Sequence, residues 1–177
     1  MAVLPIRQFG DPVLRQKAAE IEEITDIHRR LIQDMLDTMR EAPGVGLAGP
    51  QVGVMERIFV WETEDGYGAV INPTITSTSE EKIEGEEGCL SIPGLYYNVA
   101  RSYRITVEGL DENGDAATWE LEDFKARIFQ HEIDHLDGVL FIDRLSEADR
   151  KEALAILRDQ ALGLPVPTQP AKEDEVL

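Results

Sequence analysis

The spacing of hydrophobic residues predicts three amphipathic helices. Between Asp26 and Arg40, apolar residues return every three or four positions, which is the repeat of one helical face. The same pattern predicts a second helix from about Glu122 to Gly138 and a third from about Ser146 to Leu162. Ser146 is suited to cap the start of the third helix, and Gly138 is suited to end the second.

Short apolar runs in the middle of the chain predict β-strands. They cover residues 58–61, 69–71, 104–110 and 117–121. Asn113-Gly114, between the last two runs, is typical of a hairpin turn. Because turns and short strands follow one another without intervening helices, the pattern favours antiparallel sheets over parallel strand–helix–strand units.

Composition narrows the class of protein. The 177 residues carry 17 Lys and Arg against 35 Asp and Glu, a formal net charge of −18. That charge argues against direct binding to nucleic acid or to anionic membranes, and no run approaches the ~20 apolar residues that span a bilayer. The first residues also lack the apolar run of a signal peptide. The single cysteine, Cys89, excludes an intrachain disulfide, so we expect a cytoplasmic protein.

Length and composition also predict the domain organisation. The length suits one domain, and no shift in composition divides residues 1–163. Residues 164–177 contain three prolines and the charged run Lys172-Glu173-Asp174-Glu175. We therefore expect a single folded domain over 1–163 and a flexible acidic tail over 164–177.

The strongest chemical signal is a pair of histidines within the second predicted helix, in the run His131-Glu132-Ile133-Asp134-His135. A spacing of four places both imidazoles on one helical face, about one turn apart, where they can bind one metal ion. Glu132, beside the first histidine, could then reach a water molecule at the metal. Two solvated or core histidines are the alternative, although the chain contains only three histidines.

Cys89 is the natural third ligand, because a catalytic metal site usually has three protein ligands and one open position. A thiolate binds borderline divalent metals strongly, whereas the alternative is a small buried side chain. The segment from Gly44 to Gly53 is predicted to be a loop whose glycines either approach a ligand closely or simply form a turn. Gln51, near its end, is either a solvated residue or a positioned amide donor.

Three motifs, in this order along the chain, resemble those of the peptide deformylases. They are Gly44 to Gln51, Glu87 to Ser91, and His131 to His135. The resemblance covers about residues 5–160, and the predicted third helix resembles the C-terminal helix of the common bacterial type. It implies an α+β fold with antiparallel sheets packed around a central metal-binding helix, with one helix toward each end of the chain.

The resemblance also implies a reaction. Peptide deformylases are metal-dependent hydrolases that remove the N-formyl group from the formyl-methionine of newly made proteins and release formate. One divalent metal ion is expected, in the first place Fe²⁺, with Zn²⁺, Ni²⁺ or Co²⁺ able to replace it. The partners implied are N-formylmethionyl nascent peptides. We expect a monomer, and the acidic tail argues against ribosome docking through that end.

Carried onto this sequence, the motifs imply roles for individual residues. The implied metal ligands are Cys89, His131 and His135. The implied catalytic groups are Glu132 as general base and acid, and the Gln51 side-chain amide and Leu90 N–H as donors to the oxyanion. The implied substrate-binding residues are Gly44, Val45 and Gly46, along which the peptide would lie as an added strand, and Ile128 as a wall of the methionine pocket. For Ile128, an ordinary core position is the alternative.

Charged residues near the motifs extend this interpretation. Glu87 is expected to orient a ligand or nearby backbone, and Arg101 is expected to pair with Asp134 behind the ligands. The alternative is that these are solvated surface charges. Arg127 lies one turn before His131, where many relatives carry an apolar residue. If Arg127 faces the pocket, it alters the preference beyond methionine.

Two other classes of protein compete with this interpretation. A zinc peptidase of the His-Glu-x-x-His type would need a third ligand downstream, for which Glu147 and Glu152 are the available carboxylates. It would leave Cys89 and the glycine-rich segment without a role. A structural metal site is the non-enzymatic alternative, but such sites normally have four ligands, and Glu132 would be idle.

Overall fold

The fold begins with an irregular arm and the first of the predicted helices. The computed structural model describes residues 2–167 and 176–177. A short 3₁₀ turn, η1 (Pro12–Arg15), precedes α1 (Asp26–Glu41), whose apolar stripe is buried at Ile32, Met35, Leu36 and Met39. The Nδ1 atom of His28 accepts a hydrogen bond of 3.0 Å from the Thr25 N–H and so caps the start of α1.

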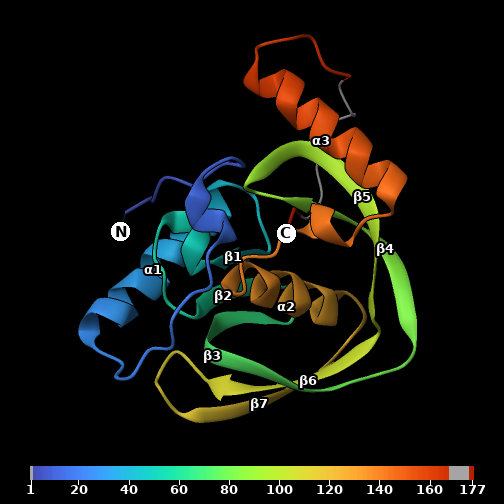
Figure 1. Cartoon of the computed structure of the whole chain (residues 1–177). Helices are drawn as coiled ribbons and strands as arrows, with labels where there is room; N and C mark the ends of the chain where they lie inside the picture. Colours follow the sequence, from blue (N-terminus) through green and yellow to red (C-terminus); the bar gives the residue numbers. More distant parts are fainter. Residues whose placement is uncertain (1, 168–175) are drawn as a thin grey trace.

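A five-stranded sheet forms one layer of the molecule (Figure 1). Its order is β1-β2-β3-β6-β7, and every neighbouring pair is antiparallel, as the turn pattern predicts. The strands are β1 (Gly46–Ala48), β2 (Ile58–Thr63), β3 (Gly66–Thr78), β6 (Arg104–Leu110) and β7 (Ala116–Glu122). β1 lies at one edge of the sheet, although the sequence pattern predicts a loop at these residues. Glycine has a low strand propensity, so the segment becomes a strand because it pairs with β2, Gly46 with Trp61 and Ala48 with Phe59.

A separate two-stranded ribbon stands beside the sheet. It consists of β4 (Lys82–Cys89) and β5 (Ile92–Ser102), which pair antiparallel. A register shift between Glu87 and Cys89 disturbs the pairing where the ribbon turns. Cys89, the only cysteine of the chain, lies at the closed end of the ribbon, where the turn joins β4 to β5.

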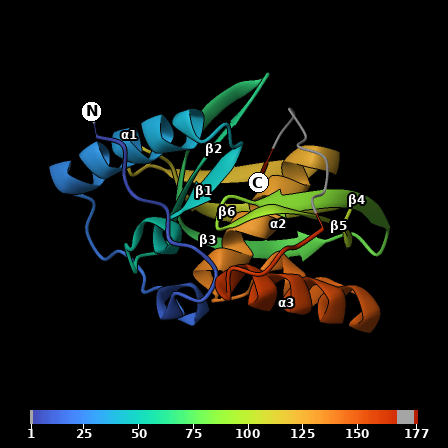
Figure 2. The ribbon, with the colours of Figure 1, turned by 90° about the horizontal axis from the view of Figure 1, so that it is seen from above.

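The second helix, α2 (Asp123–Leu136), lies in the middle of the fold (Figures 1 and 2). Every residue from Ala126 to Leu136 is buried, polar ones included. α2 packs against β1, β2 and β7 of the sheet and against β5 of the ribbon. Because the helix is enclosed on all sides, its polar side chains must find partners within the protein.

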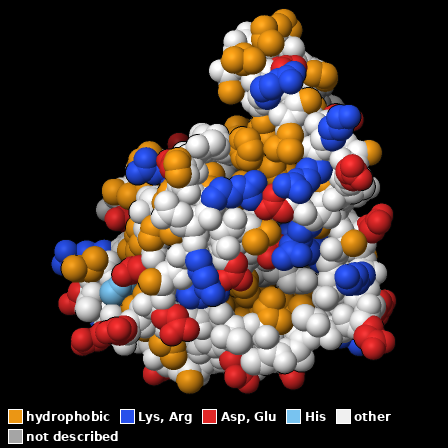
Figure 3. Space-filling model, in the orientation of Figure 1, with side chains coloured by type: hydrophobic (Ala, Val, Ile, Leu, Met, Phe, Trp, Pro, Cys, Tyr) orange, Lys and Arg blue, Asp and Glu red, His pale blue; other side chains and the backbone are white. Residues whose placement is uncertain are grey.

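The third helix, α3 (Glu147–Ala161), lies on the outside of the molecule beside β5 (Figures 1 and 2). The Ser146 hydroxyl caps it by accepting a hydrogen bond of 3.1 Å from the Asp149 N–H. Ala153, Ile156 and Leu157 bury their side chains in one cluster with residues of the ribbon. Hydrophobic side chains gather where α3 meets the rest of the molecule (Figure 3).

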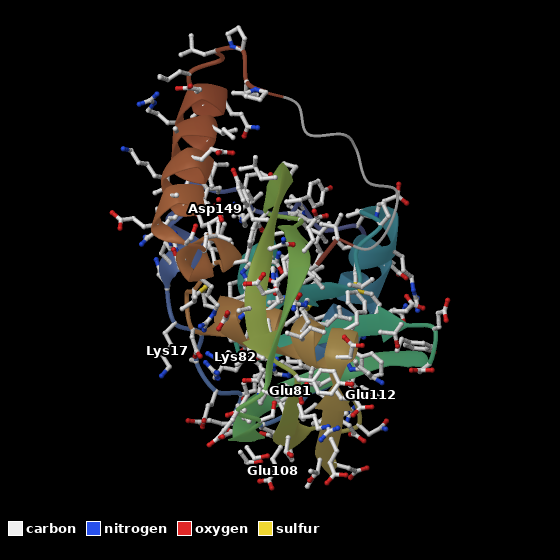
Figure 4. All side chains as sticks on the ribbon, turned by 90° about the vertical axis from the view of Figure 1, so that its right-hand side faces the viewer. Lys17, Glu81, Lys82, Glu108, Glu112 and Asp149 are labelled. Atoms are coloured by element: carbon white, nitrogen blue, oxygen red, sulfur yellow. The ribbon has the colours of Figure 1, made fainter. Side chains whose placement is uncertain are left out.

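The fold class is therefore α+β, with antiparallel sheets and three helices, as predicted. The excess negative charge lies outside: Glu81, Glu108 and Glu112 are exposed at the periphery (Figure 4). Within the described residues, no helix has the length and apolar character needed to cross a membrane. The predicted flexible tail falls mainly on residues 168–175, which lie outside the described residues. Its last two residues differ from the prediction, because Val176 and Leu177 pack against the body of the protein.

Candidate metal centre and active site

The three predicted metal ligands come together from two different elements. Cys89 ends β4, whereas His131 and His135 lie one turn apart on α2. One potential ligand atom of each residue lies within 4.8 Å of the other two, and all three residues are buried. The Nε2 atom of His135 lies 3.3 Å from the Cys89 Sγ atom. Across the described ranges no other group of His, Cys, Asp and Glu converges in this way.

The chemistry of these side chains fits a divalent metal ion. Burial raises the pKa of the Cys89 thiol to about 12, so a thiolate here needs a nearby positive charge. Burial, and then the neighbouring His131, lower the pKa of His135 well below its ordinary value, which keeps the ring neutral as a ligand must be. The Nε2 atom of His131 is buried and makes no hydrogen bond with any described residue. A bound cation would satisfy all three groups.

Glu132 lies beside this cluster, and its carboxyl group has no hydrogen-bond partner among the described residues. Its side chain is fully buried, and neither carboxylate oxygen hydrogen bonds to any described residue. Burial, and then the charge of Glu87, raise the pKa of Glu132 well above its ordinary value of 4.5. A carboxyl group with a raised pKa can accept a proton and give it up again, which a general base and acid requires.

Gly46 makes room for the Glu132 carboxyl group. A Cβ atom built on Gly46 would lie 2.3 Å from the Oε1 atom of Glu132, far closer than van der Waals contact. The edge strand β1 therefore approaches α2 closely only because position 46 has no side chain. The glycine-rich segment contributes to the site in this way, in addition to forming a turn.

The two predicted oxyanion donors lie next to the cluster. Gln51 is buried in the short 3₁₀ helix η2 (Gly49–Val52), and its Oε1 atom accepts a hydrogen bond of 2.8 Å from the Ala48 N–H. Its Nε2 atom donates to the Ser91 hydroxyl at 3.2 Å and lies 3.6 Å from the Cys89 Sγ atom. Leu90 directly follows Cys89, and its N–H donates to the main-chain oxygen of Leu177 at 2.9 Å.

A buried ion network holds the ligands from behind. Both Glu87 and Arg101 are buried, and the Arg101 guanidinium donates to the two carboxylate oxygens of Glu87 at 2.8 and 3.0 Å. As predicted, Arg101 also pairs with Asp134, at 2.6 Å. The predicted role of Glu87 in orienting a ligand agrees with the 3.0 Å between its Oε2 atom and the Nδ1 atom of His131. The network adds Arg144, whose Nη2 atom lies 2.6 Å from Asp134, and the sequence analysis did not identify this residue.

Arg127 belongs to this network and does not offer a free charge to a ligand. It is buried, and its Nη1 atom donates to Glu87 at 2.9 Å and to the Val99 carbonyl at 2.8 Å. Its Nη2 atom donates to the Ile83 carbonyl at 2.8 Å. A Cβ atom at Gly85 would lie 2.9 Å from this guanidinium, so glycine at 85 leaves space for it. Arg127 therefore ties the ribbon to α2.

Two of the predicted substrate residues, Val45 and Ile128, meet in one hydrophobic cluster. Gly44 and Val45 lead into β1, and Gly46 begins it. Ile128 is fully buried in a hydrophobic cluster with Phe129, and Val45 packs against the same cluster. Phe124 also packs there, and Leu177 is a buried member. Neither residue is predicted from the sequence, where the only signal for Leu177 is the apolar pair that it forms with Val176 after an acidic run.

The carboxylates required by the peptidase alternative lie elsewhere. Glu147 is exposed in the first turn of α3, and Glu152, also on α3, accepts a hydrogen bond of 3.0 Å from the Tyr97 hydroxyl. Neither belongs to the group of potential ligands around His131 and His135. The geometry therefore gives no support to a third ligand downstream of the histidines.

The fold and this centre define a metal-dependent hydrolase in which a cysteine joins two histidines of a His-Glu-x-x-His helix. A family model described as polypeptide deformylase matches residues 3–151. The chain belongs to this family, and it is an enzyme that removes the formyl group from the N-terminal methionine of nascent peptides.

Individual relatives agree with this assignment over most of the chain. The peptide deformylase of Acidothermus cellulolyticus is 49% identical over 159 residues, which cover 90% of this chain and 88% of that protein. The crystal structure of the peptide deformylase from Thermus thermophilus superposes with a TM-score of 0.85 at 51% identity, covering 91% of this chain and 96% of that one. The structure from Ehrlichia chaffeensis in complex with actinonin gives 0.86 at 38% identity, covering 90% and 98%.

Proposed function

We propose that Cys89, His131 and His135 bind one divalent metal ion, in the first place Fe²⁺, with Zn²⁺, Ni²⁺ or Co²⁺ as substitutes. The observation that carries this proposal is the convergence of their three ligand atoms within 4.8 Å beside the unpaired carboxyl group of Glu132. An ion held there would polarise the formyl carbonyl and lower the pKa of a water molecule from about 15.7 toward 7.

Glu132 is the proposed general base and general acid. Its buried carboxyl group accepts a proton from the attacking water and then delivers it to the amine that leaves the formyl carbon. Burial supports this role because it raises the pKa of Glu132 and keeps both oxygens away from competing donors. Because Gly46 has no Cβ atom, there is space for the Oε1 atom of Glu132 beside β1.

The Gln51 amide and the Leu90 N–H are the proposed donors to the oxyanion that develops on the formyl oxygen. The bond from Ala48 N–H fixes the Oε1 atom of Gln51, which directs its Nε2 atom toward Ser91 and Cys89. The Leu90 N–H already donates to an oxygen acceptor, the main-chain oxygen of Leu177. Loss of one such donor costs about 10²–10³ in rate in other hydrolases.

The substrate is proposed to lie along the edge of the sheet. A nascent peptide would add as a strand beside Gly44, Val45 and Gly46, and its methionine side chain would enter the apolar region near Ile128. Since the substrates are newly made peptides, we expect a cytoplasmic enzyme, and we propose that it is a monomer without direct nucleic-acid binding. The acidic tail argues against ribosome docking through that end. Actinonin, bound in the Ehrlichia chaffeensis relative, is expected to bind this chain too.

Formate release tests the proposal directly. Protein purified without oxygen and loaded with Fe²⁺ or Ni²⁺ should release formate from formyl-Met-Ala-Ser. The variant Glu132→Ala should keep its metal and lose turnover, because it removes the proton carrier and none of the ligands. A fully metallated sample that releases no formate would contradict the proposed function, and cleavage of internal peptide bonds would favour the peptidase.

A further inference from the structure

The end of the described chain returns to the substrate side of the active site. Val45 N–H donates to the Val176 carbonyl at 2.9 Å, and Val176 forms a parallel bridge with Gly44. The Leu90 N–H donates to the main-chain oxygen of Leu177 at the same distance. Both views mark the end of the chain within the body of the fold, near α2 (Figures 1 and 2). Residues 176–177 therefore bridge the edge of the sheet and the closed end of the ribbon.

The Leu177 side chain fills a position in an apolar cluster formed with residues of α2. It is 1% exposed and belongs to the hydrophobic cluster that contains Ile128 and Phe129. Leucine and methionine have similar volumes and exchange readily in apolar surroundings. The proposed methionine pocket is therefore occupied here by a side chain of suitable size from the protein itself.

The contacts of this segment coincide with those that the substrate needs. The Leu177 oxygen accepts the hydrogen bond of the Leu90 N–H, which is the proposed donor to the formyl oxygen. Val176 pairs with Gly44 at the start of β1, along the edge where the substrate strand is proposed to add. Space is also limited, because a Cβ atom at Gly44 would lie 2.7 Å from the Leu90 side chain and 3.3 Å from the Val176 oxygen. A peptide and this segment cannot occupy the cleft together.

We propose that Val176–Leu177 is an intramolecular ligand of the substrate cleft and competes with formylmethionyl peptides for it. The inference rests on the proposed function, since it assumes that Leu90 and β1 bind the substrate. The segment approaches with its carboxyl side toward Leu90, whereas a substrate would present its formylated amino end there. The main-chain oxygen of Leu177 therefore stands in for the formyl oxygen, and the segment offers no formyl group to hydrolyse.

Competition by a tethered ligand changes KM and leaves kcat alone. A short tether keeps a ligand at an effective concentration in the millimolar range. At that concentration even a weak contact, made by one leucine and two hydrogen bonds, is partly occupied. The apparent affinity for substrate equals the intrinsic affinity multiplied by the fraction of molecules in which the cleft is open. Releasing the segment should therefore lower KM by about two- to tenfold.

The experiment compares variants of the full metal-loaded chain. Leu177→Asp should lower KM for formyl-Met-Ala-Ser at unchanged kcat, and Leu177→Gly, which adds no charge, should do the same. Leu164→Asp is the matched control, because Leu164 lies in the same tail and is exposed. Leu177→Met should behave as the parent chain, since its side chain also suits the pocket.

Amide hydrogen exchange gives a readout that does not depend on turnover. The Val45 and Leu90 amides donate to the segment, so both should exchange faster in Leu177→Asp than in the parent chain and in Leu164→Asp. Unchanged KM together with unchanged exchange would overturn the inference. A KM effect that grows with enzyme concentration would also overturn it, because the ligand would then be a second copy. Altered exchange without formate release from any variant would uphold the docking and contradict the proposed function.

Discussion

The Oε2 atom of Glu87 lies 3.0 Å from the Nδ1 atom of His131, on the side of the ring away from Nε2. Burial opposes ionisation of Glu87, but hydrogen bonds with His131 and then Arg101 outweigh it and lower its pKa well below the ordinary value of 4.5. An ionised Glu87 can only accept, so Nδ1 of His131 carries the proton. A neutral ring then has its lone pair on Nε2, the atom with no partner among the described residues.

This relationship predicts that Glu87→Gln weakens metal binding. An amide in place of the carboxylate no longer fixes the protonation of Nδ1, so the ring loses its preferred orientation and basicity. Metal affinity should fall by about 10–100-fold, as for other residues that support metal-binding histidines. Competition with a metal-binding dye measures it. Glu84→Gln is the control, because Glu84 lies exposed on the same strand and should bind metal as the parent chain does. Equal affinities in the two variants would contradict the assigned role.

The buried network also predicts a large loss of stability on removal of Arg127. Arg127→Leu takes one partner from Glu87 and leaves the carbonyls of Ile83 and Val99 without their donor. Breaking a buried pair from one side costs about 3–5 kcal/mol, so the free energy of unfolding should fall by about 3 kcal/mol or more. Urea denaturation of the metal-free protein measures this.

The exposed pair of Arg104 and Glu122 supplies a control for Arg127. Their side chains are 65% and 63% exposed and lie 3.2 Å apart. Such surface pairs contribute little, so Arg104→Leu should change the free energy of unfolding by less than about 1 kcal/mol. Similar losses in both variants would show that the buried position of Arg127 has no special importance.

The helices and the paired strands of the sheet could be predicted from the sequence because their signals are local. The stripe of α1 and the cap of α3 depend on residues a few positions apart, and Arg104–Leu110 was predicted with its observed bounds. The proposed metal ligands on α2 follow from a spacing of four for the same reason. Cys89 could be proposed as third ligand because it is the only cysteine.

What could not be predicted depends on contacts between distant segments. The acidic residues of β4, such as exposed Glu84 and Glu86, do not show which element the strand packs against, because Arg127 of α2 holds the ribbon there. β1 is glycine-rich, and its pairing with β2 gives it order that local propensity does not. The position of Leu177 depends on a contact with Leu90, which lies 87 residues earlier in the chain. No local pattern records such a contact.

The close approach of β1 to α2 predicts that Gly46→Ala damages catalysis and spares the ligands. The added Cβ atom would lie 2.3 Å from the Oε1 atom of Glu132, so the carboxyl group must turn away from its position. Because general acid–base catalysis contributes about 10²–10⁴ in rate, we expect kcat to fall by about 10² with metal content unchanged. Gly68→Ala is the control: the nearest atom to a Cβ there is 3.4 Å away, an ordinary contact. Full activity in Gly46→Ala would show that Glu132 does not depend on this gap.

The buried thiol of Cys89 predicts that metal binding releases a proton. Burial raises the pKa of Cys89 to about 12 in the metal-free protein, so the group is a neutral thiol throughout the range from pH 6 to 9. A metal binds the thiolate, and each binding event must therefore displace one proton from sulfur. Because protons compete with the metal below this pKa, affinity should rise by about tenfold per pH unit, provided that His135, whose pKa is lowered, stays neutral. Proton release into weak buffer with an indicator dye measures this during a Zn²⁺ titration without oxygen. Cys89→Ser should bind metal weakly, and a parent chain that releases no proton would remove the Cys89 thiolate from the ligand set.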